Sequence, residues 1–518
     1  MGKIVGSLSA DASTVLLEWG SRLQGDVTLT DSAMLTLQGE IEGRLRADAS
    51  SALLAQRGLH LDGDIGLSNG ATLALVGRNQ SAIGAEASLL ALGYDAVQRG
   101  DIALSQSLLI SRGLIYGTLS LNNSGAYFGQ ASQHKGDLSL LGDDAWLVLQ
   151  QGGLQWGDVT LTDGAMLTSR GQTMGSLSAD ASTITLENGA FHNNGDLQLS
   201  GGAMLTSLGE IEGSLSADAS NALLEQGSQL LGDITLVSNA VLTSRGQTRG
   251  LLSADASAIT LENGAEQQGD IHLGNASSLT SQGRTEGLLS ADASTITLES
   301  GAVQQGDLQL GGASDLTSLG KIVGSLSADA SNVLLERGSQ LLGDITLAGN
   351  AALTSRGQTR GILSVAASAI TLENGAEQQG DIHLGNASSL TSQGRTEGLL
   401  SADASIIILE NGALQQGEVR LDKGAMLTSQ GWDRGQSYMP IPARSCWRKV
   451  QYSRERSAWT KVPCLPLRVG SLWAIYMPMP ARSCWRKVPY SWGISELGGA
   501  SDLTSLGAIV GNLERGRQ

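Results

Sequence analysis

Residues 250–283 read GLLSADASAITLENGAEQQGDIHLGNASSLTSQG, and the two halves of this stretch follow one plan. Each half begins at a glycine, carries short apolar pairs spaced by one residue around a small polar turn, and ends at a glycine. The step from Gly250 to Gly269 is one residue longer than the step from Leu261 to Leu279, so the inner register is left uncertain by one position. The stretch predicts a structural unit of about 18 to 19 residues.

The pair of halves repeats along the chain with a period of about 37 residues. One landmark is the tetrapeptide ADAS, and the other is the step Gly-Asp followed by an apolar residue. The acidic residues of ADAS are Asp180, Asp218, Asp255, Asp292, Asp329 and Asp403, and those of the second landmark are Asp196, Asp233, Asp270, Asp307, Asp344, Asp381 and Glu418. Two landmarks with one period indicate tandem copies of one supersecondary unit.

The apolar pairs predict short strands. Alternation such as Ile259-Thr260-Leu261 is typical of a strand, and Gly, Asn, Asp or Ser interrupts it too often for a long helix. One such unit cannot bury its apolar side alone, but a coil buries it by stacking equivalent residues about 4.8 Å apart. We therefore predict an all-β, right-handed parallel β-helix with rungs of about 18–19 residues, in which Ile259, Leu261, Ile271 and Leu273 point inward.

The composition agrees with a narrow coil. The chain has 69 Gly, which favour corners that need a positive φ, and only two Phe, so the interior would consist of Leu, Ile, Val and Ala. The landmarks weaken near residues 119–132, where ADAS has drifted. The Gly-Asp steps at Asp137 and Asp158 are separated by little more than half of the 37-residue period. This short interval predicts that about one rung is missing there.

The composition changes abruptly between residues 437 and 495, which hold all seven Pro and all three Cys. The segment PARSCWRKV occurs at 442–450 and again at 480–488, so the repeat period survives while the residues change. A reading-frame slip explains this, because codons for A-S-T-I-L-L-E-K-G read one nucleotide later can give P-A-R-S-C-W-R-K-V. We predict a repeat array over 1–436, an irregular or disordered segment over 437–495 that trypsin cuts first, and a remnant of a further repeat over 496–518.

The charge argues against two classes of partner. The net charge is −17, and since residues 437–495 contribute +9 (ten Lys/Arg, one Glu), the remainder carries −26. Such an acidic array repels nucleic acid and anionic lipid, and no run of about 18 apolar residues could span a membrane as a helix. We expect no nucleic-acid partner and no direct insertion into a membrane.

The repeated lines GDITLxNxAxLTSxGxxxG and GxLSADASxITLENGA resemble the passenger domains of type V autotransporter adhesins, which include AIDA-type, pertactin-like and large surface-exposed virulence proteins. The resemblance covers residues 1–436 and 496–511. It implies a right-handed β-helix, export through an outer-membrane barrel, display on the cell surface or secretion, and adhesion. The absence of Cys from 1–436 fits export. The sequence shows neither a signal peptide nor a translocator barrel, so we expect the chain to be an interior piece of a larger gene that the frame slip disrupts.

No catalytic, metal or cofactor site is predicted. Gly66-Leu-Ser-Asn-Gly70 fits the G-x-S-x-G pattern of a nucleophile elbow, but no helix is expected after it, so we interpret it as a corner. His60, His134, His192, His272 and His383 lack metal-binding company, and His272 and His383 are expected to face outward. The repeated Asp residues lack the calcium-binding nonapeptide and are interpreted as Asx turns.

Three functions remain open from the sequence. The first is a non-catalytic adhesin fragment that contacts host glycoprotein, matrix or a second copy of the same chain through polar rows. The second is a passive spacer, or even the non-functional product of a disrupted gene, because the near-identical copies at 268–294 and 379–405 do not single out a binding site. A polysaccharide-degrading enzyme on a β-helix is the third, and no cluster of carboxylates and bases stands out to support it. The ligand-binding residues are unknown at this stage.

Overall fold

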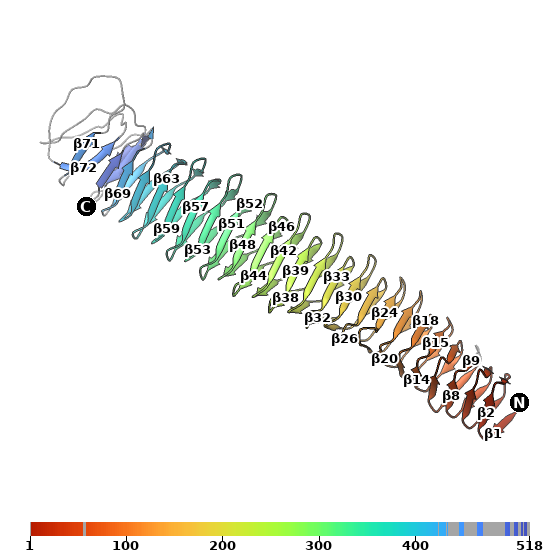
Figure 1. Cartoon of the computed structure of the whole chain (residues 1–518). Coiled ribbons are helices and arrows are strands. Elements are labelled where there is room, and N and C mark those ends of the chain that lie inside the picture. Colours follow the sequence, from red (N-terminus) through yellow and green to blue (C-terminus); the bar gives the residue numbers. More distant parts are fainter. Residues whose placement is uncertain are drawn as a thin grey trace. The chain divides into compact units, whose positions relative to one another are not determined.

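The computed structural model describes residues 2–54, 58–422, 424–430 and 432–433, and six short strands between 445 and 514. All described elements are strands or turns, and none is a helix. The chain divides into two compact units, residues 1–260 and 261–518. In each unit three parallel sheets form a right-handed β-solenoid, which confirms the predicted fold class (Figure 1).

A rung of the second unit illustrates the repeat. Strand β47 (Leu289–Asp292) lies in the first sheet, β48 (Thr295–Leu298) in the second and β49 (Val303–Gln305) in the third. The next rung consists of β50 (Leu308–Gly311), β51 (Asp315–Ser318) and β52 (Lys321–Val323), and it is followed by β53 (Leu326–Asp329). Leu289 pairs with Leu308 and Leu308 with Leu326, so a longer rung alternates with one that is shorter by a single residue.

The two rung lengths arise at the corners, because the strands have the same lengths in both rungs. Two residues (293–294) follow β47 and four (299–302) follow β48, whereas three (312–314) follow β50 and two (319–320) follow β51. These corners explain why the inner register was uncertain by one residue. Leu298 occupies the position of Leu261 in the next 37-residue repeat, and it pairs with Ser318 rather than with another leucine.

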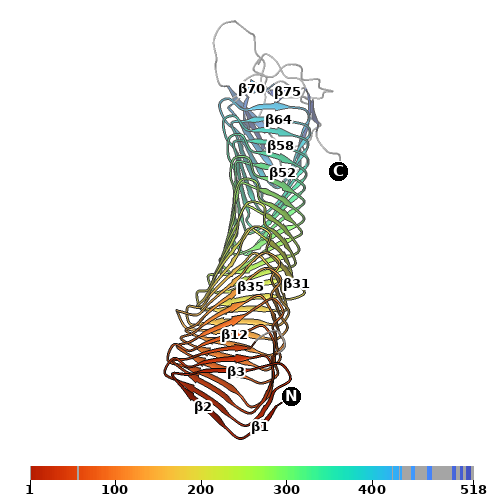
Figure 2. The same cartoon turned by 90° about the vertical axis from the view of Figure 1, so that its right-hand side faces the viewer.

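The first unit has the same architecture, and successive turns stack directly on one another (Figure 2). In it β17 (Ile102–Ser105), β18 (Leu108–Ser111) and β19 (Leu114–Ile115) form one rung. The interval between Asp137 and Asp158 contains a single rung that is longer than its neighbours, since Leu138 pairs in parallel with Val159. The stack therefore continues through this irregular spacing.

The interior consists of columns of buried side chains. Ile259, Leu261, Ile271 and Leu273 are all buried, as predicted from the alternation. Burial of one Leu or Ile side chain contributes about 1.5–3 kcal/mol, and each rung buries several. The stability of the fold is therefore spread along the array.

Two of these columns explain why the sequence repeats every two rungs. In β47 the third position is Ala291 and the last position of β48 is Leu298, whereas in the next rung the same positions hold Leu310 and Ser318. Large and small side chains thus exchange places between successive rungs. Each rung fills a similar volume, as close packing requires.

The ADAS corner uses an alanine in the left-handed region rather than a glycine. Ala293 has φ +49°, and the following Ser294 Oγ donates a hydrogen bond of 2.9 Å to Asp292 O across it. The same serine-to-carbonyl bond recurs at Ser182 and Ser331. The expectation that glycine supplies the corners therefore holds only in part.

The glycines of the Gly-Asp step are required for close approach. At Gly306, φ is +130°, and an added Cβ would lie 2.1 Å from Gly287 O of the preceding rung. The neighbouring aspartates do not form Asx turns with their own backbone, which corrects the sequence interpretation. Asp307 Oδ1 instead accepts a hydrogen bond of 2.8 Å from the backbone N–H of Ser325 on the next rung. These carboxylates join successive rungs.

Most of residues 437–495, and with them the predicted irregular segment, lie outside the described residues. Within that range β71 (Ser445–Lys449) pairs in parallel with β72 (Cys464–Val469). Beyond it β74 (Asp502–Ser505) pairs in register with β69 (Met426–Ser429), with Met426 opposite Asp502. The sequence DLTS at 502–505 thus follows MLTS at 426–429 directly in the second sheet.

Candidate binding surface

Ser68, the serine of the G-x-S-x-G match, lies at the end of β11 (Ile65–Ser68), where the first sheet turns into the second. Its Oγ donates a hydrogen bond of 3.0 Å to Asp48 Oδ1 on the preceding rung, and Asn69 occupies the left-handed region with φ +51°. The next element is the strand β12 (Thr72–Leu75), so the serine does not precede a helix. The residues form a corner, as the sequence interpretation proposed.

The five histidines divide into two groups. His272 and His383 lie at outward positions of first-sheet strands, as expected. His60, His134 and His192 are instead fully buried at the inward position of third-sheet strands. The sequence did not predict these three buried positions. Burial lowers the pKa of each of these three imidazoles below the ordinary value.

The buried histidines belong to a polar column inside the third sheet, which sequence reasoning also missed. The same inward position holds Gln, Thr or Asn in many rungs, including Asn79, Gln98, Gln155, Thr173, Gln267, Thr285, Gln304, Thr359, Gln378, Thr396 and Gln415. Several of the Gln side chains donate to carbonyls of the glycine corners, and Thr285, Thr359 and Thr396 each donate to the Gln Oε1 of the next rung. Gln304 Nε2, for example, donates a hydrogen bond of 2.8 Å to Gly287 O.

The outer side of the third sheet carries an exposed row of aromatic and cationic side chains in the first unit. The row consists of Arg99, Tyr116, Lys135 and Trp156, which follow the strands β16 (Val97–Gln98), β19, β22 (Gln133–His134) and β25 (Leu154–Gln155). Backbone hydrogen bonds place them on successive rungs, because Tyr116 N donates to Gln98 O and Trp156 N donates to His134 O, 2.9 Å each. We call this row, together with Tyr94 and Arg112 at the preceding corner of the same sheet, the aromatic face.

Two cations of the aromatic face, Lys135 and Arg112, contact its rings. Lys135 Nζ lies 5.7 Å from the ring centroid of Tyr116 on one side and 5.7 Å from that of Trp156 on the other. Arg112 Cζ lies 5.3 Å from the centroid of Tyr94. Tyr94, Tyr116 and Trp156 remain 66%, 43% and 47% exposed, so the rings are held by cation–π contacts and still face solvent.

The corresponding surface of the second unit has a different character. There many outward positions of the third sheet carry Arg, Glu and Gln that bond to one another, although strands such as β52 carry Lys321 and Val323 instead. Arg395 Nη2 donates a hydrogen bond of 2.8 Å to Gln416 Oε1 and also pairs with Glu397, and Arg284 bonds Gln305 and Glu286 in the same way. The aromatic face therefore departs from a regular, self-satisfied surface.

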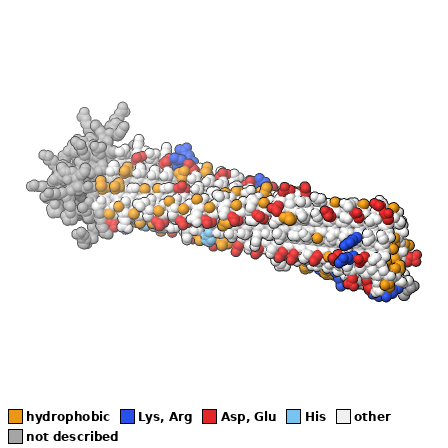
Figure 3. All heavy atoms as spheres, turned by 60° about the horizontal axis from the view of Figure 1, so that its bottom comes forward, with side chains coloured by type: hydrophobic (Ala, Val, Ile, Leu, Met, Phe, Trp, Pro, Cys, Tyr) orange, Lys and Arg blue, Asp and Glu red, His pale blue; other side chains and the backbone are white. Residues whose placement is uncertain are grey.

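The aromatic face carries cations that form no ion pair with the described residues. Between Val97 and Asn193, none of the outward residues of these described third-sheet strands is acidic. Arg99, Arg112 and Lys135 make no ion pair with any carboxylate in the described part of the chain. Elsewhere acidic side chains are prominent, as the view in Figure 3 shows. Within the described chain the aromatic face thus presents three cations without ion pairs on a protein of net charge −17, and Asp101, Asp137 and Asp158 border it at the corner into the first sheet.

The interior beneath the aromatic face is adapted to it. Phe128 is the largest buried side chain of the described residues, and its ring packs edge-on against His134, with centroids 6.0 Å apart. The inward position two residues before Phe128 is Ala126, whereas most rungs have Leu or Ile at this position. The smaller side chain of Ala126 leaves room for the phenylalanine ring. The drifted copy at 119–132 is therefore a repacked rung.

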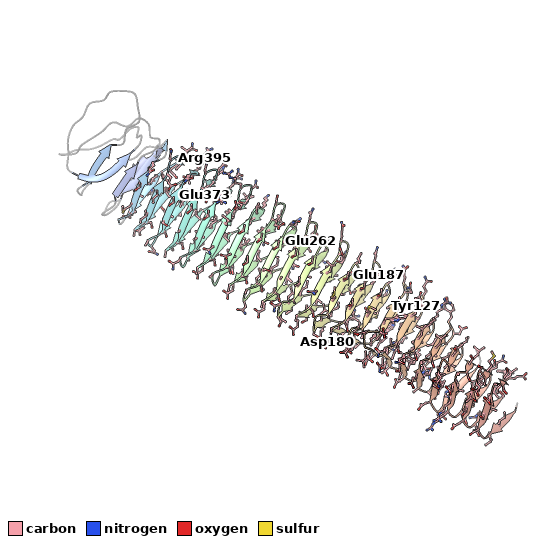
Figure 4. All side chains as sticks on the ribbon, viewed as in Figure 1. Tyr127, Asp180, Glu187, Glu262, Glu373 and Arg395 are labelled. Carbon is pink, nitrogen blue, oxygen red and sulfur yellow. The ribbon has the colours of Figure 1, made fainter. Side chains whose placement is uncertain are left out.

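An open acidic hollow of about 560 Å³ lies in the same region of the chain, where the first sheet turns into the second. It is lined by Gln106, Asn123, Gly142, Asp143, Asp144 and Asp163. In the described residues no group of three or more acidic, His or Cys side chains has an arrangement that could hold a metal ion. In Figure 4 Asp180 and Glu187 lie on opposite sides of the ribbon.

The sequence contained the information that locates this surface. Of the Phe, Trp and Tyr residues in 1–430, six fall between residues 94 and 156, namely Tyr94, Tyr116, Tyr127, Phe128, Trp146 and Trp156. That clustering coincides with the drifted copy of the repeat. What the sequence could not supply was the assignment of each ring to the inside or the outside of the coil.

None of the described residues forms a helix long and apolar enough to cross a membrane.

Comparison with known proteins gives no family: no protein-family model matches the sequence, and no curated protein is significantly similar to it.

Proposed function

We propose that this chain is a non-catalytic adhesin-like module, in which the aromatic face makes the contact and the regular rungs present it. The observation that carries the proposal is the break in repetition. Among the described residues, 94–156 place exposed rings and cations without ion pairs on one sheet, whereas on the equivalent surface of the second unit Arg284 and Arg395 are paired with Glu286 and Glu397. Selection for stability alone does not require exposed aromatic residues.

We further propose that the module belongs to an autotransporter passenger and is displayed on the cell surface or secreted. The repeat lines GDITLxNxAxLTSxGxxxG and GxLSADASxITLENGA, which resemble those passengers, support this class. The parallel β-solenoid is compatible with it, since stacked rungs can build a long array from one repeated unit. Partners in that setting would be a host glycoprotein, matrix or a second copy of the chain.

The test is adhesion by displayed protein. Bacteria that carry residues 1–436 fused to a translocator barrel should attach to epithelial cells or to one another more than bacteria that carry the barrel alone. Replacement of 1–260 by an equal number of regular rungs copied from 261–430 should remove this attachment. Equal attachment after that replacement would contradict the assignment of binding to the aromatic face.

A passive spacer is the second candidate, and the regularity of the second unit favours it for that part of the chain. The copies at 268–294 and 379–405 are identical in sequence, and their third-sheet side chains make the same contacts. If the whole chain is a spacer, attachment should be unaffected by any exchange that preserves the number of rungs.

A further inference from the structure

We propose that the aromatic face binds an acidic oligosaccharide that lies across successive rungs. This inference deepens the proposed function and rests on it, because it names the class of ligand that the same surface recognises. Three features of the described residues carry it: the spacing of the rings, the cations beside them that form no ion pair, and the absence of a free strand edge.

The ring spacing fits a carbohydrate chain. Tyr116 and Trp156 lie two rungs apart, so their separation along the coil is about 9.6 Å. This is close to the length of a disaccharide in an extended glycan. The flat, apolar faces of alternate pyranose rings could therefore stack on Tyr116 and Trp156, both of which are partly exposed.

The cations select an acidic chain over a neutral one. Lys135 lies between the two rings and Arg99 lies one rung before Tyr116, and neither has a carboxylate partner among the described residues. The protein as a whole repels anions, so a ligand carboxylate gains most beside these cations. The acids two residues beyond them, Asp101 and Asp137, each accept a hydrogen bond from a backbone N–H of the next rung. A uronic acid supplies both the carboxylate and the apolar ring face.

The backbone argues against a peptide that adds to the sheet as a strand. A peptide that docks through its backbone needs an unpaired strand edge, and one that docks through an apolar side needs a groove. The strands β16, β19, β22 and β25 are each paired on both sides, so they offer no free edge. A glycan needs neither, because it can stack on exposed rings and bond to the side chains beside them.

The test uses the full chain and two hexasaccharides of equal length. One alternates glucuronic acid with N-acetylglucosamine, and the other is neutral. The acidic hexasaccharide should bind with measurable affinity by calorimetry and the neutral one at least about tenfold more weakly. Trp156→Ala and Lys135→Gln should each weaken binding of the acidic form by about tenfold. Lys135→Arg should retain it, because the cation is kept.

Matched controls exclude a general effect of charge or aromatic content. Trp19→Ala removes another exposed ring, and Lys321→Gln removes another exposed third-sheet lysine, so both should bind as the parent does. Thermal unfolding should be unchanged in all of these variants, since the positions are on the surface.

Three outcomes would overturn the ligand class. They are equal binding of the neutral hexasaccharide, equal losses in the control variants, and preferential binding of a poly-glutamate peptide. Attachment of displayed cells that survives Trp156→Ala and Lys135→Gln would also overturn the glycan inference while leaving the adhesin proposal intact. Failure of the parent chain to mediate any attachment would contradict the adhesin proposal itself.

Discussion

The buried histidines show how a single residue depends on its neighbours along the third-sheet column. His192 Nε2 lies 2.9 Å from Gly195 O and Nδ1 lies 2.9 Å from Thr173 Oγ1. A neutral ring can donate to the carbonyl and accept from the hydroxyl. His134 lies 2.7 Å from Gly117 O and 2.6 Å from Gln155 Oε1, while the amide of Gln155 donates to Gly136 O and Gly157 O.

The hydrogen count differs between these two sites. Each of the four contacts around His134 and Gln155 needs one hydrogen to form a hydrogen bond. A neutral imidazole supplies one and the amide of Gln155 supplies two, so one contact lacks a hydrogen whichever way the amide is oriented. A proton on His134 would complete the set. These contacts therefore oppose the effect of burial at His134, and nothing equivalent does so at His192. We predict that all three buried histidines titrate below about 6.5, with His192 lowest, as ring NMR signals can measure.

The lowered pKa values predict acid sensitivity of the first unit. Because the unfolded chain takes up protons near pH 6.5 and the folded chain resists them, the free energy of unfolding should fall as the pH drops below about 6.5. Third-sheet amides of residues 58–195 should lose hydrogen-exchange protection at pH 5.5, after correction for intrinsic rates. The triple variant with Gln at positions 60, 134 and 192 should not, because Gln already occupies this column at Gln98 and Gln155. Equal acid sensitivity of the variant would contradict this account.

Some buried serines of the described chain, unlike the buried histidines, have a hydroxyl group without a hydrogen-bond partner. Among the described residues, the hydroxyls of Ser281, Ser318, Ser355 and Ser392 are buried and have no hydrogen-bond partner. We predict that Ser→Ala at any of these four positions raises stability by about 1 kcal/mol, since it removes an unpaired polar group without leaving a large cavity. Ser294→Ala is the matched control and should be destabilising, because Ser294 Oγ bonds Asp292 O. Urea unfolding would measure both effects.

At the scale of elements, the alternation of large and small side chains fixes which rung can lie on which. Ala328 lies between Leu310 and Leu347 in its column, and Leu335 lies between Ser318 and Ser355. We predict that Ala328→Leu costs about 1–3 kcal/mol through overpacking. Ala328→Val should cost less, because Val365 occupies the equivalent position two rungs later. A melting temperature that is unchanged in the leucine variant would show that the columns are not tightly packed.

The first-sheet and second-sheet strands could be predicted from the sequence, whereas the third could not. Strands such as Ala258–Leu261 have two inward apolar residues, so their alternation is visible in the letters. The third-sheet strand Glu266–Gln268 has one inward residue, and that residue is Gln267. Its strand conformation comes from stacking between equivalent rungs, which a local pattern does not contain. For the same reason the sequence did not predict that His134 lies inside and Lys135 outside.

At the scale of the whole molecule, charge and repetition have separate effects. The acidic surface keeps copies of the chain apart at low ionic strength, and salt weakens that repulsion. Any association between copies should therefore increase with salt, whereas binding of an acidic glycan to the aromatic face should weaken. The two kinds of contact can be distinguished by this opposite dependence.

Repetition predicts which deletions the array accepts. Removal of 289–325 takes out one full two-rung period and places Leu326 where Leu289 was, so stability should change little. Removal of 308–325 takes out one rung and brings Leu298 against Leu335 and Ala291 against Ala328, which overpacks one column and leaves space in the other. We predict a lower urea midpoint for the second deletion alone. Addition of Ala328→Leu and Leu335→Ser to it should not restore the midpoint, because these changes only move the mismatch to the next rung, which holds Leu347 and Ser355. Equal midpoints for the two deletions would show that single rungs are interchangeable.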